Sequence, residues 1–198
     1  VEPKELQEHL RAAVDRSFHR ISIDGDTSTN DAVFALASGA AVEAAEGAID
    51  LRTAMIKVAR ELALLIVRDG EGYERGIHVR VTGARAQADA LAVARTIASS
   101  LLVRCAVTGG DPNWGRILAA AGRSGVAISE ASLDLRVGGV PLFARGQPSD
   151  APLADRNAAF RTAMVEVHLD LGQGTAEDEF ISCGLTKAYV ELNADYTT

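Results

Sequence analysis

Residues 133–144 read LDLRVGGVPLFA, with a Gly-Gly pair between two stretches that are rich in apolar residues. Two adjacent glycines favour the tight turn of a β-hairpin, because the central residues of such a turn adopt positive φ angles that glycine tolerates. We therefore expect two strands that are joined at Gly138 and Gly139. The sheet to which they belong is then at least partly antiparallel.

Strand and helix patterns alternate upstream of this hairpin, and strand patterns cluster around it. Alternating or β-branched runs predict further strands at residues 21–23, 77–83, 126–128, 165–171 and 179–183. Apolar spacing and capping residues predict helices at 3–18, after Ser28 or Thr29, from Asp50 to 67, and at 91–101, 113–122, 151–163 and 186–196. The expected fold class is α/β, with mixed, partly antiparallel sheets layered with helices.

The composition is that of a globular chain. Its 198 residues are 47% hydrophobic, which suffices for one large domain or two small ones, with a subdivision near residue 123 left open. The net charge of -7 and the lack of a Lys/Arg cluster argue against nucleic acid or a membrane as the main partner. A membrane-span pattern and a signal-peptide pattern are both missing, so a cytoplasmic location is expected.

Cysteine and histidine give no sign of a metal site. Cys105 and Cys183 lack CxxC spacing and lie in apolar surroundings, so we expect buried free thiols without a role. The four histidines show no metal-ligand spacing, and His78 and His168 fall on the polar phase of their strands. We therefore expect a solvated sheet face around them and no bound metal.

The loop ISIDGDTSTNDAV, residues 21–33, concentrates carboxylates and hydroxyls. Asp24, Asp26 and Ser28 have the one-apart spacing of a calcium loop, but Thr29 and Ala35 replace the glycine and glutamate that an EF-hand requires. An aspartyl-phosphate enzyme would use Asp24 as the nucleophile and Asp26 as the acid, and no downstream acidic motif accompanies them. The favoured interpretation is a loop whose side chains bind backbone N–H groups.

Two other stretches indicate more than a simple turn. VRDGEG places Glu71 between two glycines at the end of a predicted helix, where the backbone can bend sharply and expose the carboxylate. At the C-terminus, polar residues follow an apolar pattern of Leu185, Tyr189, Val190 and Leu192. This pattern predicts a terminus that is docked on the protein body.

Four motifs in a fixed order now point to a family. SIDGDTSTND (22–31), VRDGEG (67–72), DPNWGRILAA (111–120) and LNADYTT (192–198) resemble the β chain of the ornithine acetyltransferases of arginine biosynthesis, also called glutamate N-acetyltransferases or the ArgJ family. The resemblance covers essentially all 198 residues. It implies that residues 1–198 are a β chain, completed by a separate α chain from the same precursor, in a heterotetramer.

The same resemblance implies the site and the chemistry. A precursor of this family cuts itself before a threonine that becomes the nucleophile. Val1 is not threonine, so we expect the nucleophile upstream of it. By position, Glu71, Asn193 and Thr198 bind substrate, whereas Asp24, Asp26 and Asn30 form a scaffold near the site. The implied ligands are N-acetylornithine, ornithine and glutamate, with acetyl-CoA as a second donor in bifunctional members, and no cofactor or metal.

Two other functions stay open from the residues alone. A self-processing amidase or aminopeptidase with an N-terminal nucleophile would release the acyl group to water, so the choice of acceptor separates it from a transferase. A processed subunit that serves only assembly would need no intact threonine in the precursor.

Overall fold

The computed structural model describes residues 1–40 and 50–195, which build one seven-stranded sheet. The strand order is β1-β7-β2-β6-β3-β4-β5. The strands are β1 Ile21–Ser22, β2 Gly76–Ala84, β3 Asp134–Val137, β4 Val140–Ala144, β5 Gln147–Pro148, β6 Met164–Asp170 and β7 Ala176–Cys183. The pairs β1–β7 and β2–β6 are parallel, and the other four pairs are antiparallel. The α/β class with a mixed, partly antiparallel sheet is therefore confirmed.

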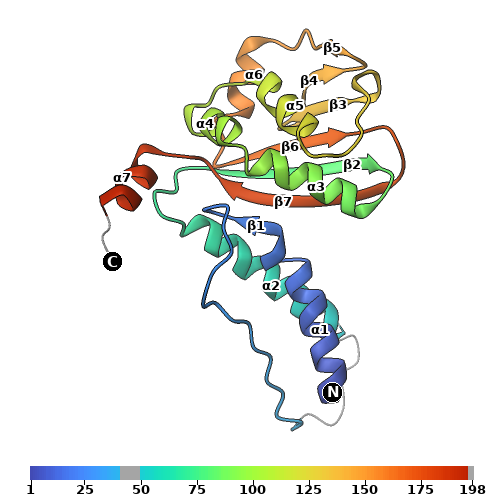
Figure 1. Cartoon of the computed structure of the whole chain (residues 1–198), viewed down its shortest axis with the longest axis vertical. Coiled ribbons are helices and arrows are strands. Elements are labelled where there is room, and N and C mark those ends of the chain that lie inside the picture. Colours follow the sequence, from blue (N-terminus) through green and yellow to red (C-terminus); the bar gives the residue numbers. More distant parts are fainter. Residues whose placement is uncertain (41–49, 196–198) are drawn as a thin grey trace.

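Helices lie on both sides of this sheet (Figure 1). They are α1 Pro3–Asp15, α2 Leu51–Arg68, α3 Gln87–Ala98, α4 Leu101–Gly109, α5 Trp114–Gly122, α6 Leu153–Ala159 and α7 Lys187–Asp195, with short 3-10 turns at η1 Phe18–Arg20 and η2 Glu130–Ser132. The helices α3 to α5 pack on one face, the pair α1–α2 extends from the β1 edge, and α7 projects at one end. No single described helix is long and apolar enough to cross a membrane, although the bent pair α3–α4 passes that test by length and composition.

The core follows from the alternation along the strands. Ile77, Val79 and Val81 of β2 are fully buried against α3, because successive side chains of a strand point to opposite faces. Trp114 at the start of α5 packs on Phe143 of β4 with ring centroids 5.3 Å apart and thereby anchors α5 to the sheet. A smaller cluster around Val67 joins the end of α2 to the second face of the sheet.

Local signals placed several elements correctly. Gly138 and Gly139 have φ angles of 55° and 79° and join β3 to β4, as the hairpin prediction required. Side chains also cap three helices as expected: Asp50 accepts from the amide of Thr53, Asn113 from that of Arg116, and Thr186 from that of Tyr189.

Five predicted elements differ from the structure. The helix expected after Ser28 or Thr29 is absent from residues 31–40, and its remainder falls in 41–49, outside the described residues. The Ser28 hydroxyl instead accepts from the amides of Asn30 and Asp31, which satisfies a turn without starting a helix. Phe34 and Leu36 are 82% and 97% exposed. An apolar face without a packing partner does not stabilise a helix.

The remaining differences have local causes. Residues 126–128 form no strand, because Val126 and Ile128 pack against the core from a loop. The helix predicted at 91–101 ends at Ala98, and α4 starts after a bend of 58°. The first helix ends at Asp15, before the 3-10 turn, and the helix predicted at 151–163 is limited to α6.

Candidate functional site

The structure brings together two of the three predicted substrate-binding residues. Glu71 lies in the turn that follows α2, and Asn193 lies on α7, far away in the sequence. The amide nitrogen Nδ2 of Asn193 donates to Oε2 of Glu71 at 2.9 Å and to the backbone oxygen of Tyr189 at 3.0 Å. Both side chains are exposed, so a small ligand can reach them. Thr198, the third predicted residue, lies outside the described residues.

The first turn of α7 sits directly on the turn that carries Glu71. Thr186 is 2% exposed, and its hydroxyl donates to the backbone oxygen of Gly72 at 2.8 Å. The same hydroxyl accepts from the amide of Tyr189 at 3.0 Å. Gly72 has a φ of +64°, and a Cβ at this position would lie 2.5 Å from the Tyr189 nitrogen. Glycine is therefore required here both for the backbone angle and for the close approach.

A buried arginine holds the segment between β7 and α7. The Nε of Arg104 donates to the backbone oxygen of Cys183 at 2.8 Å, and the backbone oxygen of Arg104 accepts from the amide of Leu185 at 3.2 Å. The guanidinium lies 5.9 Å from the centre of the Tyr189 ring. Arg104 was not predicted as a site residue. A charged residue inside the apolar run LLVRCAV was the sequence signal for it.

The loop at residues 22–31 reaches the same place. Ile23 lies against Gly70, at 3.2 Å from where a Cβ of that glycine would be. Desolvation and the nearby Asp24 carboxylate raise the pKa of the Tyr189 hydroxyl above its usual value. Three of the four sequence motifs, on β1, after α2 and on α7, thus meet at one end of the sheet (Figure 1). The fourth motif supplies the anchor Trp114.

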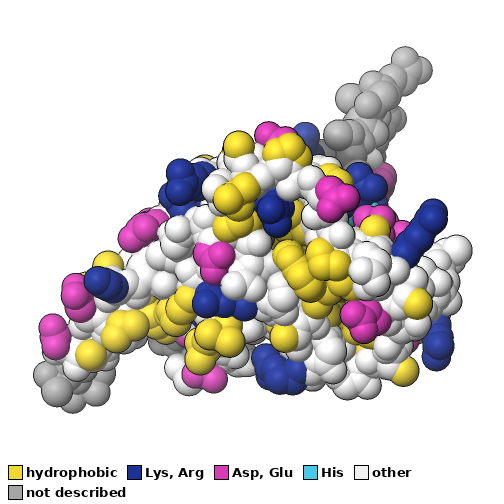
Figure 2. All heavy atoms as spheres, turned by 90° about the horizontal axis from the view of Figure 1, so that it is seen from above, with side chains coloured by type: hydrophobic (Ala, Val, Ile, Leu, Met, Phe, Trp, Pro, Cys, Tyr) yellow, Lys and Arg dark blue, Asp and Glu magenta, His cyan; other side chains and the backbone are white. Residues whose placement is uncertain are grey.

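Exposed apolar side chains lie on the helices that lead to this end of the protein. Figure 2 shows hydrophobic side chains gathered in patches between the charged ones. Nine of the exposed apolar residues lie on three helices, α2, α4 and α7, at Leu51, Val58, Leu62, Leu65, Ile66, Leu101, Leu102, Val190 and Leu192. Val190 and Leu192 of the apolar pattern before the C-terminus are 54% and 53% exposed, and residues 196–198 lie outside the described residues. Only Leu185 and Tyr189 of that apolar pattern are half-buried.

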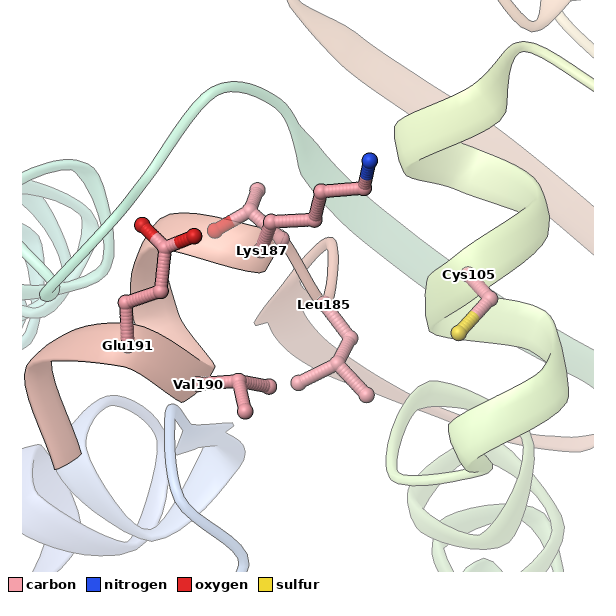
Figure 3. A pocket seen from close by; sticks show the side chains of 6 residues that line it. Cys105, Leu185, Lys187, Val190 and Glu191 are labelled. Atoms are coloured by element: carbon pink, nitrogen blue, oxygen red, sulfur yellow. The ribbon is translucent and has the colours of Figure 1, made fainter. Parts of the chain in front are cut away.

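A hollow of about 360 Å³ lies between α4 and α7. Figure 3 shows Leu185 between Val190 and the thiol of Cys105, with Lys187 and Glu191 nearby. Cys105 is exposed, so the prediction of two buried thiols is wrong for this residue and correct for Cys183. The reason is that Cys105 lies on the outer side of α4, next to the exposed Leu101 and Leu102.

The second face of the sheet carries a network of charged side chains. His78 bridges two carboxylates, with Nδ1 at 2.7 Å from Glu166 and Nε2 at 2.9 Å from Glu179. Glu179 also pairs with Arg60 of α2. The prediction of a solvated face is correct only in part, because the His78 side chain is 23% exposed and Arg60 of α2 reaches Glu179 on this face. The opposite charges pair with one another and help to hold α2 against the sheet. Within residues 1–40 and 50–195, no three His, Cys, Asp or Glu side chains are placed to hold a metal ion.

This network predicts a pH dependence of stability. Partial burial favours neutral His78, but hydrogen bonds and charges from Glu179 and Glu166 outweigh it and raise the pKa of His78 above 6.5. The stabilisation of the folded protein by charged His78 is therefore complete below about pH 6.5, and it is lost as the pH rises through the folded-state pKa of His78. The hydrogen bond from His78, together with Arg60, lowers the pKa of Glu179 from 4.5 to about 2. The stabilisation of the folded protein by the Glu179 carboxylate is therefore present above about pH 4.5 and is lost as the pH falls towards 2.

We expect His78→Gln to lower the unfolding temperature most between about pH 5 and 6.5, and progressively less as the pH rises above 6.5. Thermal unfolding of wild type and variant across this range measures the difference. His168→Gln is the matched control, because its ring bonds the Thr82 hydroxyl at 2.9 Å instead of a carboxylate. A difference that stays constant with pH for His78→Gln would contradict the prediction.

Known proteins resemble the chain over its whole length. The model of the ArgJ family matches residues 1–198. The arginine biosynthesis bifunctional protein ArgJ of a Synechococcus strain is 45% identical over 215 residues, with 100% of this chain and 51% of the relative covered. The protein of the same name from Deinococcus radiodurans is 46% identical over 187 residues, with 94% and 47% covered.

A solved structure has the same fold. The crystal structure of the arginine biosynthesis bifunctional protein argJ from Bacillus halodurans superposes with a TM-score of 0.92 at 35% identity. The match covers 99% of this chain and 95% of that chain. By contrast, this chain spans about half the length of the curated relatives that it matches.

Proposed function

This chain belongs to the ArgJ family, and on that premise we propose that residues 1–198 are the β chain of a self-processed acetyltransferase. The enzyme transfers the acetyl group of N-acetylornithine to glutamate, in the cytoplasm, as a step of arginine biosynthesis. The observation that carries the proposal is the contact between Glu71 and Asn193, which joins two distant family motifs in one exposed site.

The chemistry of these two side chains suits an amino-acid substrate. The Glu71 carboxylate can hold the side-chain ammonium of ornithine through a charge-assisted hydrogen bond, which contributes about 1.5–3 kcal/mol. A carboxylate offers several acceptor positions, so the bond from Asn193 leaves room for the ammonium. The Asn193 amide can both donate and accept, and we assign it, together with Thr198, to the α-substituents of the acetylated amino acid.

The proposed reaction is a ping-pong acyl transfer. Its nucleophile is a threonine that precedes Val1 in the precursor, with its own α-amino group as the base. The threonine oxygen attacks the acetyl carbonyl of N-acetylornithine, and the α-nitrogen of ornithine leaves with the proton. The amine of glutamate then takes the acetyl group from the threonine ester. The scheme needs no metal and no bound cofactor.

A separate α chain completes the proposed site. The exposed apolar side chains on α2, α4 and α7 favour burial against a partner. The curated relatives are about twice as long as this chain, so the other half of the precursor is the natural cover for this surface. Two αβ units are expected to pair symmetrically into a heterotetramer.

Product analysis tests the proposed function. The complex produced from the complete precursor receives N-acetylornithine with and without glutamate. We expect the complex to form N-acetylglutamate and ornithine, and to do so only when glutamate is present. Release of acetate at the same rate without glutamate would instead show the amidase that was the alternative. Because the curated relatives are named bifunctional, acetyl-CoA is part of the proposal as a second donor, and replacing N-acetylornithine with it tests that activity.

The C-terminus supplies a further prediction. Deleting Thr198, or adding a tag after it, is expected to lower acetyl transfer about tenfold without preventing assembly, because one hydrogen-bonding group is lost or displaced. The motivating observation is that Asn193, five residues earlier, already contacts Glu71. Steady-state kinetics of tagged and untagged complexes, with the α:β ratio checked by mass, measure the effect. Equal kinetic constants would remove Thr198 from the site.

A further inference from the structure

The position of α7 depends on few contacts within the described chain. None of its residues is buried, so the helix is not held by packing into the core. Its first turn is fixed instead through Thr186, whose hydroxyl bonds Gly72 on one side and the amide of Tyr189 on the other. The Asn193–Glu71 contact is the second attachment, almost two helical turns further on.

We infer that Thr186 is a positioning residue for the proposed acetyl transfer, which sets the distance and angle between Glu71 and Asn193 without touching substrate. The inference rests on the proposed function, because those two side chains are the substrate-binding pair of that proposal. Thr186 suits this role because one hydroxyl both caps the helix with Asn193 and bonds the turn with Glu71. A residue that only capped α7 would leave the helix free to shift relative to the turn.

The distance between Thr186 and Asn193 along α7 makes the Asn193–Glu71 contact sensitive to small tilts of the helix. Asn193 lies seven residues beyond Thr186, which corresponds to about 10 Å along an α-helix. A tilt of about 6° at the first turn would therefore move the Asn193 amide by about 1 Å. Misplacement of this size in a substrate site costs on the order of a hundredfold in rate. Small changes at Thr186 are thus expected to reach the site.

Close packing leaves no room for movement between the first turn of α7 and the turn at Gly72. The backbone of Gly72 approaches the Tyr189 nitrogen so closely that no Cβ fits between them. On the opposite side of the segment, Arg104 holds the carbonyl of Cys183 and the amide of Leu185. Thr186 is therefore fixed in place before α7 begins, and its hydroxyl can transmit that position to the Glu71 turn.

The experiment compares Thr186→Val and Thr186→Ser in the complex produced from the complete precursor. Valine keeps the shape and removes both hydrogen bonds, whereas serine keeps both. We expect the valine variant to raise KM for N-acetylornithine by at least about tenfold, with a smaller change in kcat, and serine to stay within about twofold of wild type. The matched control is Thr96→Val, which removes a hydroxyl bonded only within its own helix α3.

A double variant separates positioning from general destabilisation. If Thr186 acts through Glu71, then Thr186→Val should add little to the loss caused by Glu71→Gln. Equal KM values for Thr186→Val and Thr96→Val, a fully additive double variant, or failure of serine to restore KM would each overturn the inference. If the valine complex does not assemble, Thr186→Ala replaces it, and failure of both to assemble would also overturn the inference.

Measurements on the wild-type complex distinguish failure of the proposed acetyl transfer from failure of the inference about Thr186. Absence of N-acetylglutamate from wild type would overturn the proposed function and this inference with it. Normal transfer by wild type together with unchanged kinetics of Thr186→Val would overturn the inference alone.

Discussion

Residues 1–198 produced without the rest of the precursor are expected to transfer no acetyl group above the uncatalysed rate. The proposed nucleophile lies upstream of Val1, and removing the nucleophile of an acyl-transfer enzyme costs a factor of about 10⁶ in kcat. The exposed apolar side chains on α2, α4 and α7 give a second reason, because the isolated chain exposes the surface that we assign to its partner. Activity assays of the isolated chain and of the complete complex, at equal molarity, measure the difference.

A surface variant tests whether the exposed apolar side chains bind the α chain. Leu65→Ser removes an apolar side chain that is 56% exposed in this chain, so it should weaken assembly with the α chain more than it destabilises the β chain itself. Arg136→Ser is the control, because Arg136 lies on β3 and bonds only the nearby Asp134. Full acetyl transfer by the isolated chain would contradict the prediction, as would equal recovery of α chain with both variants.

The elements that were predicted correctly are those whose signals are local. A Gly-Gly turn, a capping Asp50 or Asn113 and a strand with strict alternation each act over a few residues, so no knowledge of distant contacts is needed. The largest failure, the helix expected over residues 31–40, depends on packing that a local pattern cannot supply, because Phe34 and Leu36 lie exposed on this chain.

The candidate site was predictable only in part for the same reason. The family resemblance indicated Glu71 and Asn193, but their contact spans 122 residues of sequence and depends on the sheet that joins α2 to α7. Thr186 was predicted as a helix cap, whereas its bond to Gly72 depends on the tertiary fold. Arg104 could have been found as a charge within an apolar helix, because a buried arginine requires specific partners.

Replacing Glu71 with glutamine is expected to lower kcat/KM for N-acetylornithine by about 10- to 100-fold, which corresponds to the loss of one charge-assisted hydrogen bond. The change is nearly isosteric, and the amide oxygen of Gln can still accept from Asn193, so the turn and α7 should keep their positions. Self-cleavage and folding should therefore stay near wild type. What the variant loses is the negative charge opposite the ornithine ammonium.

Three comparisons isolate that charge. Glu74→Gln changes an exposed glutamate three residues away and should leave the kinetics unaltered. The second half-reaction should be affected less, because glutamate brings no side-chain ammonium to the site. The gap between wild type and Glu71→Gln should narrow at high ionic strength, because salt screens charges at exposed sites. Unchanged kcat/KM for N-acetylornithine in Glu71→Gln would remove Glu71 from the substrate site, and an equal loss in Glu74→Gln would show that the net charge of the loop, and not a specific contact, attracts the substrate.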